Sequence, residues 1–160
     1  MPAGTISVRV VRVVDGDTIK VMVGRRTERV RLIGMDTPET KRNRKFERDI
    51  RKERTKTPRE VLAAGREAKE YMSGLLKRGD AVRLEKDVQE RDKYGRLLAY
   101  VWLEGGGPQG KPLLLNAALL ENGYARLMTI PPNVKRVEYF RKLQEYARQN
   151  HAGIWSRLAR

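Results

Sequence analysis

The sequence ISVRVVRVVDGDTIKVMVGRRTERVRLIGM, residues 6–35, carries the clearest structural signal in this chain. Apolar and polar residues largely alternate along it, and β-branched residues are frequent, as in half-buried strands. Asp15-Gly16 and Gly24-Arg25-Arg26 are turn signals between the apolar segments. We therefore expect three strands, within residues 6–13, 18–23 and 28–35, joined as an antiparallel meander.

A helix is expected to follow this meander. Thr57-Pro58-Arg59-Glu60 is a helix start, because Thr57 can cap the helix, Pro58 has a preset φ and Glu60 completes a capping box. Apolar residues then keep helical spacing as far as Leu75, and Gly79 is expected to end the helix.

The remaining elements complete an α+β order. We expect two strands within residues 80–86 and 95–103, a short helix within 113–122, and a last helix through 137–147 that Asn133 caps. The order β-β-β-α-β-β-α-α is compatible with a five-stranded Greek-key barrel of the OB-fold type with three α-helices. That fold ranks first among several α+β folds, and the length favours one domain over residues 1–160.

The charge is strongly unbalanced. Thirty-five Lys and Arg residues face 20 Asp and Glu residues, which gives a formal net charge of +15. Such an excess predicts salt-sensitive attraction to polyanions, and nucleic acid ranks ahead of membrane surfaces or acidic proteins. A highly charged surface of the kind found in thermophiles is the alternative.

Several classes of chemistry are excluded by residue counts. The chain has no Cys, so it has no disulfide, no Cys-based zinc site and no thiol nucleophile. His151 is the one histidine, which excludes a multi-histidine metal site. No apolar run approaches the roughly 20 residues that a membrane-spanning helix needs.

Five charged residues suit a phosphodiester in reaction: Asp17, Arg31, Asp36, Glu39 and Arg96. Carboxylate oxygens bind hard cations such as Ca²⁺, and the planar guanidinium of Arg pairs with phosphate in bidentate fashion. Taken alone, Arg31 would also suit an edge position that faces solvent. Residue types therefore predict a nucleic-acid-cutting site only if the fold brings these side chains together.

The motifs that contain these residues resemble the staphylococcal nuclease (thermonuclease) family. The similar blocks are DGDT (15–18), RLI (31–33), DTPETK (36–41), GREA (65–68), DKYGRLLAY (92–100), NAAL (116–119) and GIWS (153–156). They follow one order from about Thr5 to Ser156, so the resemblance covers nearly the whole chain. It implies a Ca²⁺-dependent endonuclease of low sugar specificity that acts on DNA or RNA and leaves 3′-phosphate ends.

The resemblance also implies roles for the residues that match the family's motifs. Asp17 and Asp36 would be side-chain ligands of one Ca²⁺ ion, and the backbone carbonyl of Thr37 would complete the protein's share. Glu39 would orient or deprotonate the attacking water.

Four further residues would contact the substrate by the same resemblance. Arg31 and Arg96 would bind the scissile phosphate and the charge that develops on it, and are therefore counted with Glu39 as catalytic. Lys93 and Tyr94 would hold a neighbouring phosphate.

Three features depart from the family's pattern. Residues 41–58 form a basic insertion, within a stretch of ten basic and three acidic residues between Lys41 and Arg59. This stretch predicts either a short amphipathic helix or a loop, and either an arm for nucleic acid or a solvated charged surface. Thr129 stands where an active-site tyrosine is found in the family's best-known member. The N-terminus shows no secretion signal, so we expect a cytoplasmic protein, with a trimmed secreted protein as the alternative.

Two functions of other classes stay open at the sequence level. One is a noncatalytic OB-fold module that binds nucleic acid, and the other is an architectural basic protein that coats DNA. The presence of all five charged residues favours the enzyme. We expect a monomer with nucleic acid as its partner, and we predict neither a protein partner nor a membrane.

Overall fold

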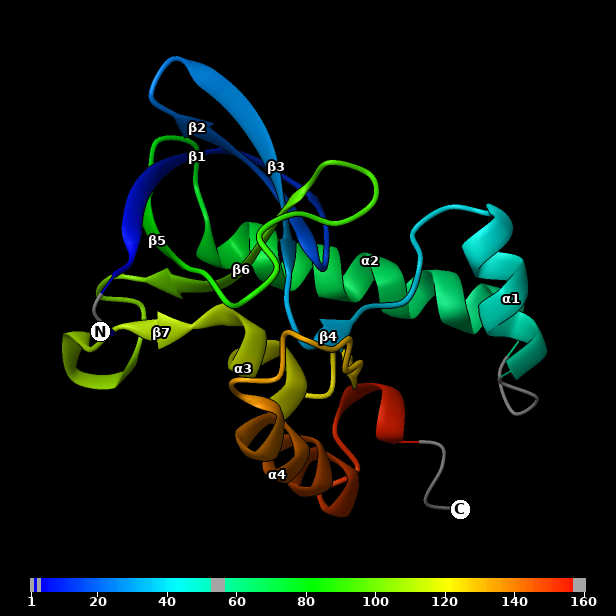
Figure 1. Cartoon of the computed structure of the whole chain (residues 1–160). Helices are drawn as coiled ribbons and strands as arrows, with labels where there is room; N and C mark the ends of the chain where they lie inside the picture. Colours follow the sequence, from blue (N-terminus) through cyan, green and yellow to red (C-terminus); the bar gives the residue numbers. More distant parts are fainter. Residues whose placement is uncertain (1, 3, 53–56, 157–160) are drawn as a thin grey trace.

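Five strands form a closed barrel, and Figure 1 shows it in the upper part of the molecule, with α3 (Leu115–Glu121) and α4 (Val137–Gln149) below it. The computed structural model of the chain describes residue 2 and residues 4–52 and 57–156. The barrel strands are β1 (Ile6–Asp15), β2 (Thr18–Val23), β3 (Arg26–Leu32), β5 (Ala81–Glu85) and β6 (Leu97–Leu103). They run in the order β3-β2-β1-β5-β6, and a parallel pairing of β3 with β6 closes the ring. The predicted OB-fold barrel and its α+β class are confirmed.

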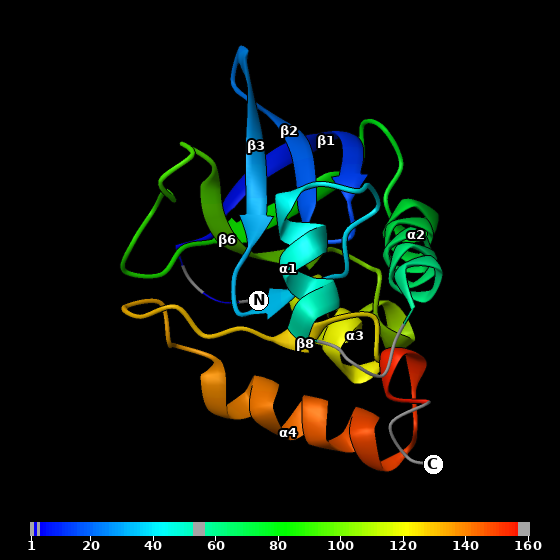
Figure 2. The ribbon, with the colours of Figure 1, turned by 90° about the vertical axis from the view of Figure 1, so that its right-hand side faces the viewer.

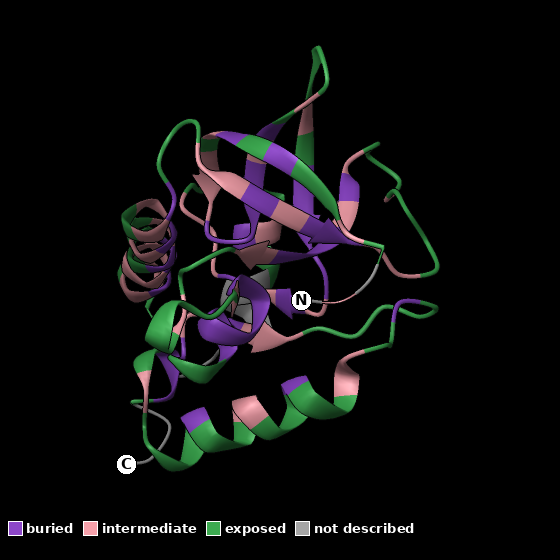
Figure 3. Cartoon of the chain, turned by 90° about the vertical axis from the view of Figure 1, so that its left-hand side faces the viewer, coloured by how far each residue is buried: buried purple, intermediate pink, exposed green. Residues whose placement is uncertain are grey.

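The meander at residues 6–35 has the predicted antiparallel pairing, and β1 also pairs with β5. Register shifts at Val10–Arg12 and Val13–Asp15 bend β1, as strands must bend to close a barrel. Residues pointing inward alternate with exposed ones, and Figure 3 shows this as alternating bands along the strands. Ile19, Val21 and Val30 are fully buried in the core.

Short strands and helices cover the barrel. The short strands are β4 (Met35–Asp36), which pairs with β8 (Arg126–Leu127), and β7 (Leu113–Leu114), which pairs with β6. The described ranges hold four α-helices: α1 (Arg44–Lys52), α2 (Pro58–Leu75), α3 (Leu115–Glu121) and α4 (Val137–Gln149). Two 3-10 turns, η1 (Pro108–Gly110) and η2 (Gly153–Trp155), complete them. No helix in these ranges is long and apolar enough to cross a bilayer.

The third strand is shorter than predicted. β3 ends at Leu32, and the chain turns at Gly34, which has a φ of +86°, before β4 begins. A side chain at Gly34 would also collide with the ring of Phe140. Alternation alone could not reveal this break, because apolar residues continue on both sides of it.

Helix α2 begins as predicted, since the Thr57 hydroxyl accepts a hydrogen bond from the Glu60 N–H. It ends earlier than predicted, however. The helix stops at Leu75, and Leu76 takes an extended conformation before the turn at Gly79. α2 packs against β1, with Ala68 and Met72 fully buried.

The predicted cap of the last helix is wrong. α4 begins at Val137 after Arg136, and Asn133 lies outside it. The Asn133 side chain instead accepts a hydrogen bond from the Gln89 N–H (2.7 Å) and donates one to the Gln89 carbonyl (2.9 Å). Asn133 therefore joins the segment before α4 to the loop that follows β5.

The basic segment adds a helix to the three that were predicted. Asn43 caps α1, because its side-chain oxygen accepts a hydrogen bond from the Phe46 N–H at 2.8 Å. Phe46 is 1% exposed and anchors the first turn. Figure 2 shows α1 on the near side of the molecule, outside the barrel. Of the two expectations for this segment, the helix is confirmed over residues 44–52, and residues 53–56 of the insertion lie outside the described ranges.

Candidate active site

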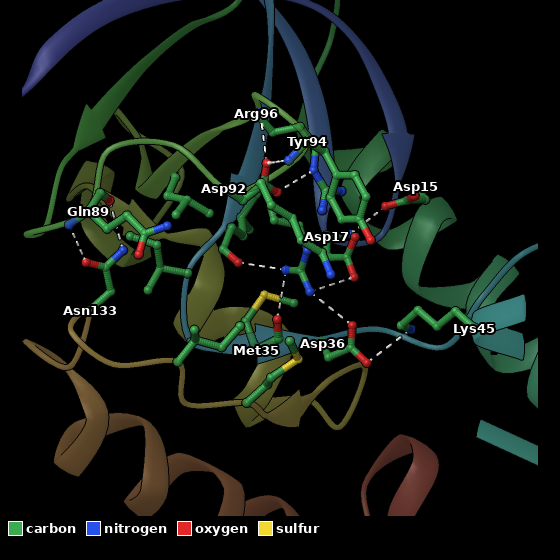
Figure 4. A pocket seen from close by; sticks show the side chains of 18 of the residues that line it. Asp15, Asp17, Met35, Asp36, Lys45, Gln89, Asp92, Tyr94, Arg96 and Asn133 are labelled. Atoms are coloured by element: carbon green, nitrogen blue, oxygen red, sulfur yellow. Dashed lines mark hydrogen bonds and ion pairs between the residues drawn. The ribbon is translucent and has the colours of Figure 1, made fainter. Parts of the chain in front are cut away.

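Seven of the eight predicted site residues line one pocket of about 620 Å³. They are Asp17, Arg31, Asp36, Glu39, Lys93, Tyr94 and Arg96. The eighth, Thr37, is buried and lies next to Asp17. The parallel pairing of Arg31 with Leu98 brings together residues that stand about sixty positions apart in the sequence. The barrel thus assembles the two motif blocks into one site (Figure 4).

Asp17 is fixed by the turn between β1 and β2. Its carboxylate accepts hydrogen bonds from the Thr37 N–H at 3.2 Å and the Thr18 hydroxyl at 3.1 Å. The Asp17 N–H donates to the carboxylate of Asp15 at 3.1 Å. Asp17 is 6% exposed, so this side chain has little freedom to move.

Arg31 is buried at the end of β3 and does not face solvent. Its Nη1 donates to the carbonyls of Leu32 (2.7 Å) and Met35 (2.9 Å), which holds the turn between β3 and β4. Its Nη2 lies 3.0 Å from Asp36 Oδ1 and 3.5 Å from Asp17 Oδ2. The Arg31 guanidinium therefore fixes the backbone of the turn and also holds the carboxylates of Asp17 and Asp36, the two predicted metal ligands, close to each other.

Lys45 of α1 lies on the other side of the site. Figure 4 shows its contact with Asp36. Its Nζ lies 3.1 Å from Asp36 Oδ2, 3.2 Å from Glu39 Oε1 and 3.2 Å from the carbonyl oxygen of Thr37. The second Glu39 oxygen accepts a hydrogen bond from Asn43 at 3.1 Å. The start of α1 is thus joined to the site through side chains.

The third group of site residues lies on the turn between residues 91 and 96. Asp92 accepts hydrogen bonds from the backbone N–H groups of Tyr94 and Arg96, and from Arg96 Nε at 2.7 Å. Arg96 Nη1 lies 3.5 Å from the Thr18 hydroxyl, and the guanidinium packs on the ring of Tyr94. Lys93 approaches the same ring, which is 71% exposed. Asp92 therefore orients Arg96 toward Thr18, which follows Asp17 in the chain.

Two glycines allow the segments of the site to approach one another. A Cβ at Gly16 would lie 2.8 Å from both Thr37 Cγ2 and Ala68 Cβ. A Cβ at Gly65 in α2 would collide with the carbonyl oxygen of Glu39. The absence of these side chains lets α2 support the backbone that carries Thr37 and Glu39.

The carboxyl groups of the site titrate differently. Burial opposes ionisation of Asp17, but the Arg31 guanidinium, Asp15 and the Thr37 N–H lower its pKa. Burial and the neighbouring Asp17 raise the pKa of Asp15 to about 7. Burial, with the charge of Asp17, also raises the pKa of Asp36 despite Lys45 and Arg31. Burial and the proximity of the carboxyl groups therefore oppose the simultaneous ionisation of Asp15, Asp17 and Asp36.

The donor atoms fit a hard divalent cation by type. Asp17 and Asp36 approach the same Arg31 Nη2, and the Thr37 carbonyl accepts from the same Lys45 that contacts Asp36. Oxygen donors of these kinds are the ligands of Ca²⁺ and Mg²⁺. In the described part of the chain, no three His, Cys, Asp or Glu side chains form a preassembled metal cluster. Arg31 and Lys45 hold the candidate ligands.

Several pocket residues were not predicted as site residues: Asp15, Lys45, Arg48, Gln89, Asp92 and Asn133. Asp15 and Asp92 stand inside the quoted motifs, so the motifs contained a signal for them. Lys45 and Arg48 are two of ten basic residues in one segment, and nothing in that run distinguishes them. Thr129 is exposed, and Met128 and Ile130 on either side of it line the pocket.

Comparison with known proteins identifies the family of the chain. The family model described as "Staphylococcal nuclease homologue" matches residues 29–157. The chain is 38% identical to the thermonuclease of Staphylococcus hyicus over 92% of this chain and 75% of that protein. It is 38% identical to the thermonuclease of Staphylococcus intermedius over 91% of this chain and 74% of that protein. Endonuclease YncB of Bacillus subtilis is 32% identical over 95% of this chain and 63% of that protein. The chain belongs to the staphylococcal nuclease homologue family.

Proposed function

We propose that this chain is an endonuclease that hydrolyses phosphodiester bonds in nucleic acid. Its expected cofactor is Ca²⁺, its substrates are DNA and RNA with little sugar specificity, and its products carry 3′-phosphate ends. The observation that carries this proposal is the convergence of acidic and guanidinium side chains from both motif blocks on one pocket. Relatives named as thermonucleases and endonucleases support it.

The cationic side chains would bind the substrate. Arg31 and Arg96 present planar donors that suit the scissile phosphate, and the charge on its oxygens grows toward the transition state. Asp92 and the backbone carbonyls of the β3–β4 turn hold these groups in place before substrate arrives. Lys93 and the exposed ring of Tyr94 would hold the next phosphate along the strand.

The carboxylates would divide between metal binding and proton transfer. Asp17, Asp36 and the Thr37 carbonyl would hold the divalent ion, and that ion would supply positive charge to the phosphate oxygens. Glu39 lines the same pocket and would accept a proton from the attacking water. General-base help of this kind typically contributes about 10²–10⁴ in rate.

The whole-molecule charge supports a polyanionic substrate. A net charge of +15 favours fast association with nucleic acid, and that association should weaken as salt rises. We further propose that the protein acts as a monomer with nucleic acid as its partner.

A cleavage assay tests this function. Single-stranded DNA, duplex DNA and RNA are each incubated with the protein in Ca²⁺, in Mg²⁺ or in chelator, and the product ends are identified. We expect cleavage of DNA and RNA with Ca²⁺, products that carry 3′-phosphates, and no cleavage in chelator.

Two other outcomes of this assay would contradict the proposed function. Cleavage that persists in chelator would contradict metal dependence. Binding without cleavage under every condition would identify a noncatalytic OB-fold module instead.

A further inference from the structure

Lys45 contacts oxygens that belong to two of the proposed metal ligands and to the proposed base. Its ammonium contacts three oxygens, from the Asp36 carboxylate, the Glu39 carboxylate and the Thr37 carbonyl, all at 3.1–3.2 Å. Asp36 and Thr37 are two of the proposed metal ligands, and Glu39 is the proposed base. One side chain of the protein thus engages the oxygens that the reaction needs.

A lysine ammonium and a divalent ion compete for these oxygens. Ca²⁺ binds oxygen at about 2.3–2.6 Å, so both cations would stand within a few ångströms of each other around Asp36. Like charges at that separation repel strongly in a partly buried site, where Asp36 is 21% exposed and Lys45 28%. Metal binding at Asp36 and Thr37 therefore requires the ammonium to move away.

The first turn of α1 holds Lys45 in this place. Phe46 is buried beside it, and Asn43 both caps the helix and donates a hydrogen bond to Glu39. Lys45 itself is only partly buried, and its long stem can swing outward without unfolding the turn.

We propose that Lys45 is an internal cation that competes with the divalent metal ion, so that α1 controls access of the metal to the site. In the metal-free protein the ammonium neutralises Asp36 and Glu39. When metal binds, the ammonium leaves these oxygens. The apparent metal affinity is then lowered by the fraction of molecules in which Lys45 still holds them. This gives the basic insertion a role that its composition did not predict.

Calorimetric titration of the full chain with Ca²⁺ at one fixed pH tests this competition. We compare wild type with Lys45→Gln and with Lys45→Arg, which keeps a competing positive charge. Arg44→Gln is the matched control, because it removes the same charge from an exposed neighbour in α1. Release of the ligands should lower the apparent Kd of Lys45→Gln about tenfold, and Lys45→Arg should stay near wild type.

Melting temperatures measured with and without Ca²⁺ test the same competition between Lys45 and the metal ion, and they need no substrate. In chelator, Lys45→Gln should melt below wild type, because Asp36 and Glu39 lose the ammonium while Asp36 keeps Arg31 and Glu39 keeps Asn43. Saturating Ca²⁺ should then raise its melting temperature by more than it raises that of wild type.

Three results would overturn this inference. Equal changes in Kd for Lys45→Gln and Arg44→Gln would show a general charge effect instead of competition. Weaker Ca²⁺ binding by Lys45→Gln would show that Lys45 supports the metal. Metal binding is part of the proposed function, on which this inference rests. If wild type cleaves only with metal but Lys45→Gln has the wild-type Kd for Ca²⁺, this inference is wrong and the proposed function stands. If the chain neither binds metal nor cleaves nucleic acid, both are wrong.

Discussion

The pocket has two walls that are built differently. The strand wall consists of Asp17, Arg31 and Asp36, and backbone groups fix it: the Thr37 N–H holds Asp17, and two carbonyls hold Arg31. The helix wall consists of Glu39 and Lys45, which are joined to each other and to α1 through side chains. The strand wall is therefore preorganised by the barrel, whereas the helix wall can exchange its partners. Changes to the strand wall should reduce stability and activity together, whereas changes to the helix wall should alter metal binding or the cleavage rate with a smaller loss of stability.

The largest effect on stability is expected from Arg31→Met, which leaves two acidic side chains of the strand wall without their guanidinium. Breaking such a nearly buried ion pair typically costs about 3–5 kcal/mol, and we expect about 3 kcal/mol because Lys45 still contacts Asp36. Urea unfolding in chelator measures this loss. Arg83→Met, which breaks the exposed pair with Glu104, is the control and should cost less than about 1 kcal/mol. Equal losses of unfolding free energy for Arg31→Met and Arg83→Met would show that the buried ion pairs of the strand wall stabilise the fold no more than an exposed pair does.

A smaller loss is expected where α2 supports the backbone of both walls. Gly65→Ala should lower the free energy of unfolding by about 2 kcal/mol, because its methyl group would meet the Glu39 carbonyl. Gly74→Ala in the same helix has open space and should raise the free energy of unfolding by about 0.5–1 kcal/mol. Thermal unfolding of both variants measures the contrast. If the two substitutions change the free energy of unfolding in the same direction, the close approach of Gly65 to Glu39 does not determine which residue the fold accepts there.

Asp92→Asn should reduce activity more modestly. The amide keeps an acceptor for Arg96 but loses the charge that orients the guanidinium, so kcat/KM should fall about tenfold, or about 1.4 kcal/mol. Steady-state cleavage kinetics measures this change, with the exposed Glu90→Gln as control. An unchanged kcat/KM would mean that Arg96 needs no orientation by Asp92.

Asp92 should also contribute a distinct dependence of stability on pH. Burial opposes its ionisation, but hydrogen bonds from Arg96 and the Tyr94 N–H lower its pKa below the ordinary 3.8. A carboxyl group with a lowered folded pKa stabilises the protein above its unfolded pKa, and this stability is lost as pH falls through the folded pKa. Below about pH 4, wild type should therefore lose stability that Asp92→Asn never had. Parallel curves for the two proteins would contradict this.

The smallest effect concerns the basic face of α1. Arg44→Gln combined with Arg48→Gln should reduce the salt slope of single-stranded DNA binding by about 1.4 if both residues contact phosphates. Arg141→Gln with Lys142→Gln on α4 removes the same charge from residues that do not line the pocket and should leave the slope nearly unchanged. Fluorescence titrations between low and moderate salt measure both. Identical salt slopes for the two double variants would indicate that the basic residues of α1 form a solvated charged surface and do not contact nucleic acid.

The sequence predicted the strand wall better than the helix wall, for a physical reason. Asp17, Arg31 and Asp36 lie in the motifs that carry the family resemblance, as does Glu39 of the helix wall, and these motifs stand at strand ends and turns. Lys45 is one of many basic residues in its segment, and its contacts with Asp36 and Glu39 depend on how α1 packs. No local pattern records that packing.

The wrong expectations have the same origin. Asn133 resembles a helix cap in its local sequence, but its side chain pairs with Gln89, which is 44 residues away. The break at Gly34 depends on hydrogen bonds from Arg31 and on the ring of Phe140. Barrel strands follow from local periodicity, whereas these features arise from contacts between distant segments.

Glu39 offers the most direct test of the pocket as a nuclease site. The measurement is the cleavage rate of a single-stranded DNA oligonucleotide with saturating Ca²⁺ for wild type, Glu39→Gln and the exposed α1 control Glu47→Gln. We expect Glu39→Gln to lose about 10²–10⁴ in rate while it still folds and binds DNA, and Glu47→Gln to cut like wild type. Cleavage by Glu39→Gln at the wild-type rate would contradict the assignment of this pocket as the catalytic centre.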